Sequence, residues 1–141
     1  MPVIQPYRRY NKYCIKTVMQ SMYFFETSDD IPVSRKRQRS AFSPNFVHSL
    51  DSTHMLMTAL KMKEASLSFA SVHDSYWTHA CSIDDMAKLL RMCFVELYSQ
   101  PVLENLRDSL IIRYPELTFP PLPERGDLDI KNVLNSKFFF H

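Results

Sequence analysis

The chain has 141 residues, of which 45% are hydrophobic and 23% charged, so it is long enough to bury a core and has the composition of a globular domain. A formal net charge of +2 excludes a strongly basic nucleic-acid-binding domain as the global explanation, but not a local basic patch. The single glycine excludes a glycine-rich phosphate loop, and no apolar run approaches the roughly 20 residues of a membrane span, so we expect no membrane partner.

The first 34 residues predict extended structure. Residues 1–8 are short, apolar and bounded by prolines, which indicates an edge strand or an extended lead-in. The β-branched and aromatic residues of 12–25 predict one strand. A polar connection over residues 26–34 follows. It carries two adjacent acids, Asp29 and Asp30, for which a solvated loop is favoured over a metal site.

A basic run precedes the first predicted helix. Such a run is typical of a nuclear signal, of a contact with nucleic-acid phosphates or of a solvated face. Its charged members are Arg35, Lys36, Arg37 and Arg39. We favour a contact with nucleic-acid phosphates.

A helix is predicted from Pro44 and Asn45 to about residue 65. His48, Asp51 and His54 follow one another at intervals of three, so they lie on adjoining parts of one helix face. The two histidines are about 120° apart around the helix, which argues against a zinc site. We therefore expect Asp51 to orient a neighbouring histidine by a hydrogen bond. For His54 the alternative is a buried core histidine.

The stretch from Leu67 to Ala80 predicts a β-hairpin with an acid at its tip. Its first strand is apolar or small on both faces, which predicts cover on both sides. We expect the turn at Asp74 and Ser75, and Tyr76 and Trp77 mostly in the core. A carboxylate in this position suits Mg²⁺, which prefers oxygen ligands, whereas the simpler interpretation is that Asp74 caps the turn.

The C-terminal half predicts helices followed by an extended segment. Ser82 begins an amphipathic helix, with Asp85 placed to complete a capping box, and Pro101 begins a second helix that ends at about Arg113. Four prolines within residues 114–123 predict an extended chain. A turn at Gly126 and a short helix over 128–134 follow, and the phenylalanines of 138–140 are expected to bury against another part of the protein.

Four segments, in the same order along the chain, resemble the C-terminal region of the single-subunit, bacteriophage-type RNA polymerases in their mitochondrial form. The most specific is Val-His-Asp-Ser-Tyr-Trp-Thr-His-Ala over residues 72–80, which is similar to the third palm motif. The others are residues 2–7, residues 45–54, and the ending over 125–130 and 138–141. The resemblance implies an α+β fold, namely the C-terminal part of a palm/fingers region in which helices pack a hairpin that carries the catalytic aspartate. It also implies one partial domain over 1–141, with a C-terminal foot at about 124–141 that folds back toward the active site.

The resemblance assigns roles to individual residues. Asp74 is implied as the catalytic residue and Mg²⁺ ligand, and His48 as a nucleic-acid contact near the primer end. The basic run contacts nucleic-acid phosphates through Arg35, Lys36, Arg37 and Arg39. Supporting structural roles fall to His73, Asp51 and His54. His141 departs from the small residue with which the family often ends.

The implied partners are the DNA template, the RNA transcript, ribonucleoside triphosphates and the rest of a polymerase chain, in the mitochondrion. The family's first palm aspartate and its fingers lysine and tyrosine lie upstream of the region resembled here, so we expect the chain alone to be inactive. Two other interpretations stay open. One is a non-catalytic nucleic-acid-binding remnant, and the weaker one is a small metal hydrolase that uses Asp74, His73, Asp51 and His79.

Overall fold

A computed structural model describes residues 5–26 and 28–139 of the chain. Helices and short antiparallel sheets make up the fold, so the α+β class predicted from the sequence is confirmed. The described residues divide into two compact units, which we call the N-terminal unit (5–47) and the C-terminal unit (48–139). None of the helices described has the length and apolarity that a membrane crossing requires.

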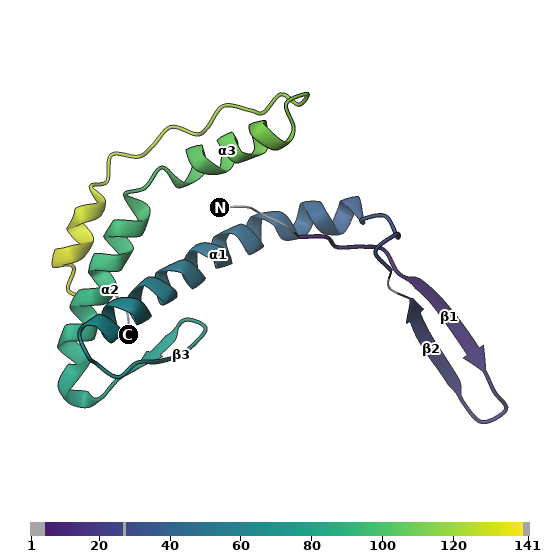
Figure 1. Ribbon diagram of the computed structural model, residues 1–141, viewed down its shortest axis with the longest axis horizontal. Helices are drawn as coiled ribbons and strands as arrows, with labels where there is room; N and C mark the ends of the chain where they lie inside the picture. The colour runs from purple at the N-terminus through teal and green to yellow at the C-terminus, as the bar shows by residue number, and fades with distance from the viewer. Residues whose placement is uncertain (1–4, 27, 140–141) are drawn as a thin grey trace. The chain divides into compact units, whose positions relative to one another are not determined.

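The N-terminal unit contains two strands where the sequence predicted one (Figure 1). Strands β1 (Asn11–Lys16) and β2 (Ser21–Glu26) pair antiparallel, in a register that runs from Asn11 opposite Glu26 to Lys16 opposite Ser21. The chain reverses between Thr17 and Gln20, where the Thr17 side chain donates to the Gln20 carbonyl at 3.0 Å and accepts from the Gln20 amide at 3.1 Å. Threonine thus makes a turn inside a run of strand-forming residues, which the propensity of that run does not reveal.

Residues before β1 form no regular strand among those described. They make one isolated bridge, between Arg8 and Val33, and the part of the predicted lead-in at 1–4 lies outside the described residues. The two acids of the connection are placed as a solvated loop predicts. Asp29 is exposed and pairs with Arg8 at 3.4 Å, and Asp30 bonds the Ser28 hydroxyl at 3.4 Å.

Helix α1 runs from Arg35 to Glu64, so it begins ten residues before the predicted start. Ser34 precedes it: its carbonyl accepts from the Gln38 amide at 2.9 Å, and its hydroxyl accepts from the Arg37 amide at 3.5 Å. Pro44, which had indicated the start of the helix, lies inside it. Because proline has no amide hydrogen, the Ser40 carbonyl lacks its usual partner in the helical hydrogen-bond ladder.

The C-terminal unit holds a second hairpin and two more helices. Strands β3 (Ala70–Val72) and β4 (Ser75–Trp77) pair antiparallel, and helices α2 (Ile83–Tyr98) and α3 (Val102–Arg113) follow. A 3₁₀ turn, η1 (Ala80–Ser82), leads into α2. Ser82 is the N-cap residue as predicted, but its side chain makes no capping bond, so the predicted capping box is wrong. The preceding 3₁₀ turn buries the Ser82 side chain, which removes it from the helix end.

The core of this unit lies between α1 and α2. Met62 has 0% exposure, and the other buried side chains are those of His54, Thr58, Ser82, Leu90, Cys93 and Leu97. Burial raises the pKa of the Cys93 thiol, which is consistent with a packing role for this cysteine. The β3–β4 hairpin, in contrast, is not covered on both faces as predicted: Ala70, Val72 and Trp77 are exposed in the described structure.

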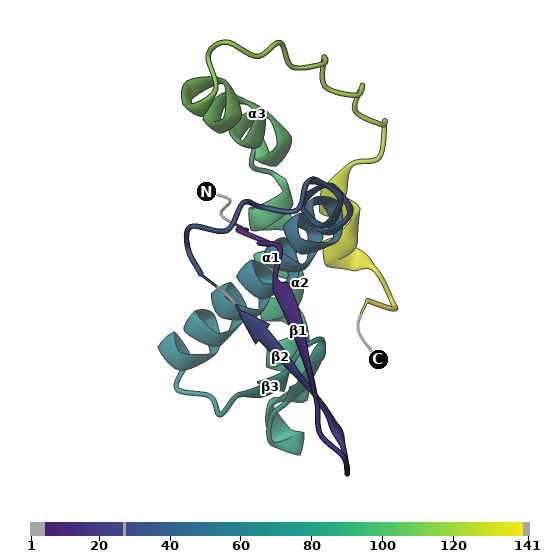
Figure 2. The same cartoon turned by 90° about the vertical axis from the view of Figure 1, so that its right-hand side faces the viewer.

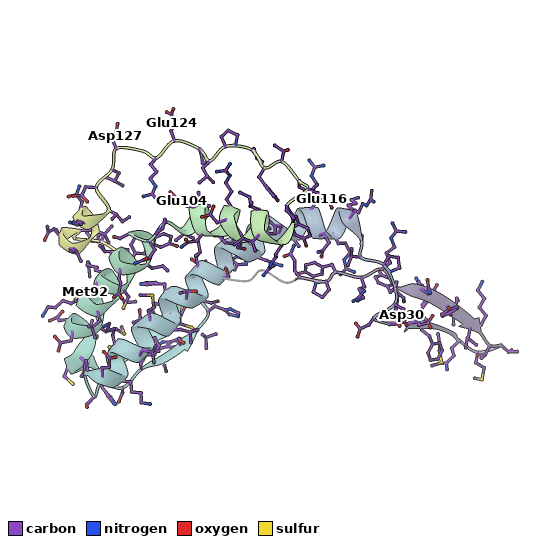
Figure 3. The ribbon with its side chains drawn as sticks, turned by 45° about the horizontal axis from the view of Figure 1, so that its top comes forward. Asp30, Met92, Glu104, Glu116, Glu124 and Asp127 are labelled. Atoms are coloured by element: carbon purple, nitrogen blue, oxygen red, sulfur yellow. The ribbon has the colours of Figure 1, made fainter. Side chains whose placement is uncertain are left out.

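After α3 the chain runs back toward α2 without regular structure, as its prolines predicted (Figures 1 and 2). Arg125 ties this segment to α3 through an ion pair with Glu104 at 2.7 Å, while Glu124 and Asp127 point away from α3 (Figure 3). The short helix expected over 128–134 is a 3₁₀ helix, η2 (Ile130–Asn135), which packs on α2. Phe139 is partly buried but Phe138 is 67% exposed, so burial of the terminal phenylalanines is only partly as predicted. Phe140 lies outside the described residues.

Candidate active site at the β3–β4 hairpin

Three contacts fix the β3–β4 hairpin in place. The Thr78 hydroxyl donates to the Ser68 carbonyl at 2.6 Å and closes the open end of the hairpin. The Ser71 hydroxyl lies 3.1 Å from the Met55 sulfur on α1. The rings of Phe69 and Tyr76 pack at 5.6 Å. The hairpin is therefore held from its base and from α1, and its tip stays exposed.

The tip of the hairpin is a two-residue turn made by His73 and Asp74, one residue earlier than predicted. Val72 pairs with Ser75, which leaves only these two residues in the loop. His73 has a φ of 53°, in the left-handed region that a histidine enters less readily than a glycine. Tight reversal in two residues requires such a conformation. The backbone strain at His73 thus accompanies an exposed carboxylate at the next position.

An open cavity of about 690 Å³ joins the hairpin tip to one face of α1. The α1 side chains that line it are His48, Asp51, Ser52 and Met55, and those of the hairpin are His73 and Asp74. The two sequence motifs singled out separately, on a helix and on a hairpin, therefore meet at one surface. In the described part of the chain, neither the Asp51 nor the Asp74 carboxylate makes a hydrogen bond or an ion pair.

The two carboxylates create a negative potential at this surface. Burial is the main cause that raises the pKa of Tyr76, and the charges of Asp51 and Asp74 raise it further. Burial raises the pKa of Tyr98 as well, again with a contribution from Asp51. Both acids thus act on one tyrosine of β4. A cation placed in the cavity would gain from the same potential.

The donor set suits a magnesium ion that is shared with ligands from elsewhere. Mg²⁺ is usually held by one or two carboxylates together with substrate phosphates and water, and Asp74 offers an exposed carboxylate at the hairpin tip. No group of three or more histidine, cysteine or acidic side chains that could hold a metal occurs in the described residues. The described residues therefore contain no self-contained metal site, and a metal at Asp74 would need ligands from elsewhere.

Of the two histidines on α1, the structure exposes His48 at the cavity and buries His54. The Nε2 atom of His54 lies 2.9 Å from the Leu90 carbonyl, which can only accept, so Nε2 carries the hydrogen. The ring of Phe94 meets the His54 ring edge-on at 5.7 Å. His54 is thus the buried core histidine that had been one of its two interpretations. The expected hydrogen bond in which Asp51 would accept from a histidine ring is not among the contacts of the described residues.

The basic run lies on the first turn and a half of α1, in the N-terminal unit. Arg37 has structural contacts: it donates to the Arg8 carbonyl at 3.4 Å, and its guanidinium lies 5.6 Å from the Tyr7 ring centre. Arg35, Lys36 and Arg39 are exposed. The first turn of α1 holds no acid. Cations at the positive end of a helix dipole are unfavourable unless an anion is near, so this end of α1 suits a phosphate.

Sequence reasoning misplaced Trp77 and missed Arg91, which both line a cavity with Asp74. A second cavity, of about 490 Å³, is lined by Asp74 and Trp77 of the hairpin, by Leu90 and Arg91 of α2, and by Phe139. Trp77 is 52% exposed rather than in the core. Arg91 had no distinguishing signal, because one arginine on an amphipathic helix is typical of a solvated face. Only the return of the C-terminal segment to α2 reveals its contacts.

Comparison with known proteins identifies the family of this chain. The family model described as DNA-dependent RNA polymerase matches residues 1–117. The chain belongs to the DNA-dependent RNA polymerase family. This membership confirms the resemblance stated from the four sequence segments.

The relatives of this polymerase-family chain include organellar enzymes of plants. It is 57% identical over all 141 residues to "DNA-directed RNA polymerase 1B, mitochondrial" of Nicotiana tabacum and spans 14% of that protein. It is 53% identical to "DNA-directed RNA polymerase 2, chloroplastic/mitochondrial" of Arabidopsis thaliana, of which it also spans 14%. A shorter relative, "DNA-directed RNA polymerase 1A" of Nicotiana tabacum, is 56% identical, and the chain spans 90% of it.

Proposed function

We propose that this chain is the C-terminal portion of a DNA-directed RNA polymerase that carries out template-directed nucleotidyl transfer in mitochondrial transcription. The observation that carries the proposal is the cavity where the His48–Asp51 face of α1 meets the His73–Asp74 turn. Each motif alone could also be explained by a purely structural role. Their convergence, in a chain 57% identical throughout to a mitochondrial RNA polymerase, supports a palm-type active site.

In this proposal Asp74 is the catalytic carboxylate and a ligand of Mg²⁺. Bound divalent ions would supply activation of the primer 3′-hydroxyl and stabilisation of the leaving pyrophosphate. The hairpin keeps the Asp74 carboxylate exposed and in a fixed direction, and Asp51 adds negative potential beside it. His73 shapes the turn through its left-handed backbone, which supports its structural role.

Nucleic acid contacts are assigned to His48 and to the basic run. His48 is exposed beside Asp74, where the primer end would lie. Arg35, Lys36 and Arg39 are exposed at the start of α1 and suit phosphates of the DNA template or RNA transcript. The ribonucleoside triphosphate would also need groups from the rest of the polymerase chain. We therefore propose that the 141 residues alone are inactive, and that the protein acts in the mitochondrion.

A chimaera tests the proposal. The matching segment of the tobacco mitochondrial polymerase 1B is replaced by this chain, and RNA extension is measured on a primed template with Mg²⁺. We expect activity within about tenfold of the parent, because the exchange keeps 57% of the residues. Asp74→Asn in the chimaera should lower kcat by at least about 10³-fold, since a metal ligand is removed. Asp127→Asn, which changes an exposed acid of the extended segment, serves as the matched control.

Two results would contradict the proposal. One is a folded chimaera that makes no RNA although the tobacco parent does. The other is an Asp74→Asn chimaera that retains the activity of the Asp127→Asn control. Extension by the purified 141 residues alone would contradict the narrower claim that this portion is inactive by itself.

The second candidate function is a non-catalytic nucleic-acid-binding remnant of such a polymerase. The exposed side chains of Arg35, Lys36 and Arg39 support it, because contacts with phosphates need no catalytic carboxylate. A remnant predicts salt-dependent binding to an RNA–DNA hybrid that survives Asp74→Asn. The size of the native polypeptide, measured by blotting with an antibody to residues 114–141, separates the two: a band far above 16.6 kDa supports the polymerase, and a band at 16.6 kDa supports the remnant.

A further inference from the structure

Arg91 of α2 binds the C-terminal segment as well as its own helix. Its Nη1 donates to the Ala87 carbonyl one turn earlier at 2.8 Å, and its Nη2 donates to the Ser136 carbonyl at 3.1 Å. Its guanidinium lies 5.6 Å from the centre of the Phe139 ring. One side chain thus holds the backbone and a ring of residues 136–139, which we call the tail.

The Phe139 ring is the part of the tail that packs against α1 and α2. It meets the Phe94 ring edge-on at 5.0 Å and the His54 ring at 6.4 Å. It also lines the cavity of about 490 Å³ that contains Asp74 and Trp77. The tail therefore forms one wall of a space that begins at the proposed catalytic carboxylate.

The contacts of Arg91 differ from those of an ordinary surface cation. Arg91 is half-buried and makes no ion pair within the described residues, so its charge serves two carbonyls and an aromatic face. Hydrogen bonds from a charged donor are stronger than neutral ones. The planar fork can reach two carbonyls and still cover a ring, which a lysine ammonium cannot do.

We propose that Arg91 is a positioning residue that seats the tail on α2, so that Phe139 closes the wall of the Asp74 cavity. The proposal rests on the proposed function for its catalytic consequence, but the seat itself can be tested without activity. Loss of Arg91 frees the tail, removes Phe139 from the cavity and leaves the hairpin without that wall. Arg91 itself touches no reacting atom.

The seat is tested first on the full 141-residue chain. Trp77 is the only tryptophan and lines the same cavity, so its quenching by acrylamide reports the presence of Phe139. We expect Arg91→Ala to speed hydrogen exchange in peptides over residues 130–139 about tenfold and to increase Trp77 quenching. Phe139→Ala should give the same quenching, and the double variant no more than either single one.

Lys88→Ala is the matched control, because Lys88 lies one turn before Arg91 on α2 and pairs only with Asp85, at 3.5 Å, among the contacts described. Circular dichroism checks that each variant folds. Arg91→Lys, which keeps the charge and stem, should give an intermediate effect and guards against loss of the fold. Exchange and quenching in Arg91→Ala that match those in Lys88→Ala would overturn the proposal.

The catalytic consequence is tested in the chimaera with the tobacco polymerase. Arg91→Ala and Phe139→Ala should each lower kcat about tenfold with the nucleotide KM within about twofold, and their effects should not add. A raised KM at unchanged kcat would overturn the positioning role. An inactive parent chimaera would instead contradict the proposed function, and the exchange result would still decide whether Arg91 seats the tail.

Discussion

The two units of the chain differ in charge and in what they bury. Residues 3–47 carry eight lysines and arginines against three acids, a net charge of +5, whereas residues 48–141 carry nine against twelve, a net charge of −3. Every buried side chain described lies in the C-terminal unit, and both strands of the β1–β2 hairpin are exposed along their length.

The two units therefore differ in what supports their exposed residues. The C-terminal unit has a small core that can hold Asp74 in place. An isolated two-stranded hairpin is at best marginally stable, and large apolar side chains exposed on one usually meet a partner. The overall charge of +2 hides this contrast, because the basic and acidic regions largely cancel.

The largest expected effect comes from breaking the core that only one unit has. Met62→Ala should lower the free energy of unfolding by about 3 kcal/mol, because Met62 is fully buried between α1 and α2. Met19→Ala makes the same chemical change at a side chain that is 95% exposed and should stay within about 0.5 kcal/mol. Urea unfolding measures both. Equal losses would mean that the β1–β2 hairpin contributes as much to stability as the core.

The charge contrast predicts where a nucleic acid binds. Replacing the four basic-run residues should weaken binding to an RNA–DNA hybrid and reduce the slope of log K against log salt by about 3, since up to four phosphate contacts are lost. The replacements are Arg35→Gln, Lys36→Gln, Arg37→Gln and Arg39→Gln. The matched control removes four cations from the C-terminal part, by Lys61→Gln, Lys63→Gln, Lys88→Gln and Lys131→Gln, and should keep the slope. A slope that falls equally in both sets would contradict a localised phosphate contact.

The negative potential of the C-terminal unit predicts a loss of stability in alkali. Burial and the two carboxylates raise the pKa of Tyr76, so folding favours its protonated form. This contribution is fully present below the tyrosine's unfolded pKa and is lost as pH rises through the higher folded value. Tyr76→Phe should therefore flatten the fall in stability above pH about 10, measured by urea unfolding at several pH values.

Asp51→Asn sharpens this test. It should lower the pKa of Tyr76, followed by NMR of ring-labelled tyrosine, because it removes one of the two charges. Asp127→Asn provides the control on an exposed acid. A Tyr76 pKa that is insensitive to Asp51 would mean that burial alone accounts for its elevation.

The smallest effect concerns the start of α1. The Ser34 hydroxyl accepts from the Arg37 amide at a long 3.5 Å, so Ser34→Ala should cost about 0.5 kcal/mol, at the low end for an N-cap. Thermal unfolding of the chain with Ser34→Gly as a comparison measures it. A loss above about 1.5 kcal/mol would show that the basic start of α1 depends on this cap far more than the distance indicates.

Local patterns were sufficient to predict part of this structure. Helices α2 and α3 and a hairpin that presents Asp74 follow from periodicity and turn signals within a few residues, whereas the α+β class was implied by the family resemblance. The early start of α1 could not be predicted, since proline inside a helix is normally a boundary signal. The apolar first strand of the hairpin predicts cover on both faces, whereas cover depends on residues that are distant in the sequence.

In the candidate site, too, local motifs predicted some residues, while others depend on contacts between distant parts of the chain. Asp74, His48 and Asp51 were found because each stands in a distinctive local motif, and their meeting at one cavity is set by tertiary packing. Arg91 carries no motif, and Phe139 lies in the 138–141 ending, whose resemblance implied only that it folds back toward the site. Their pairing depends on a segment that leaves α3 and comes back over many residues, and no spacing rule on either side anticipates that return.

Pro44 also affects how helix α1 unfolds locally. A helix of 30 residues is usually stabilised by a continuous series of amide-to-carbonyl hydrogen bonds. In α1 the bond from residue 44 to the Ser40 carbonyl is missing, close to the boundary between the two units. Fraying that begins at the basic end of α1 therefore has a natural stopping point before it reaches His48. We therefore expect the part of α1 that carries the candidate site to stay protected from hydrogen exchange while the part that carries the basic run opens locally.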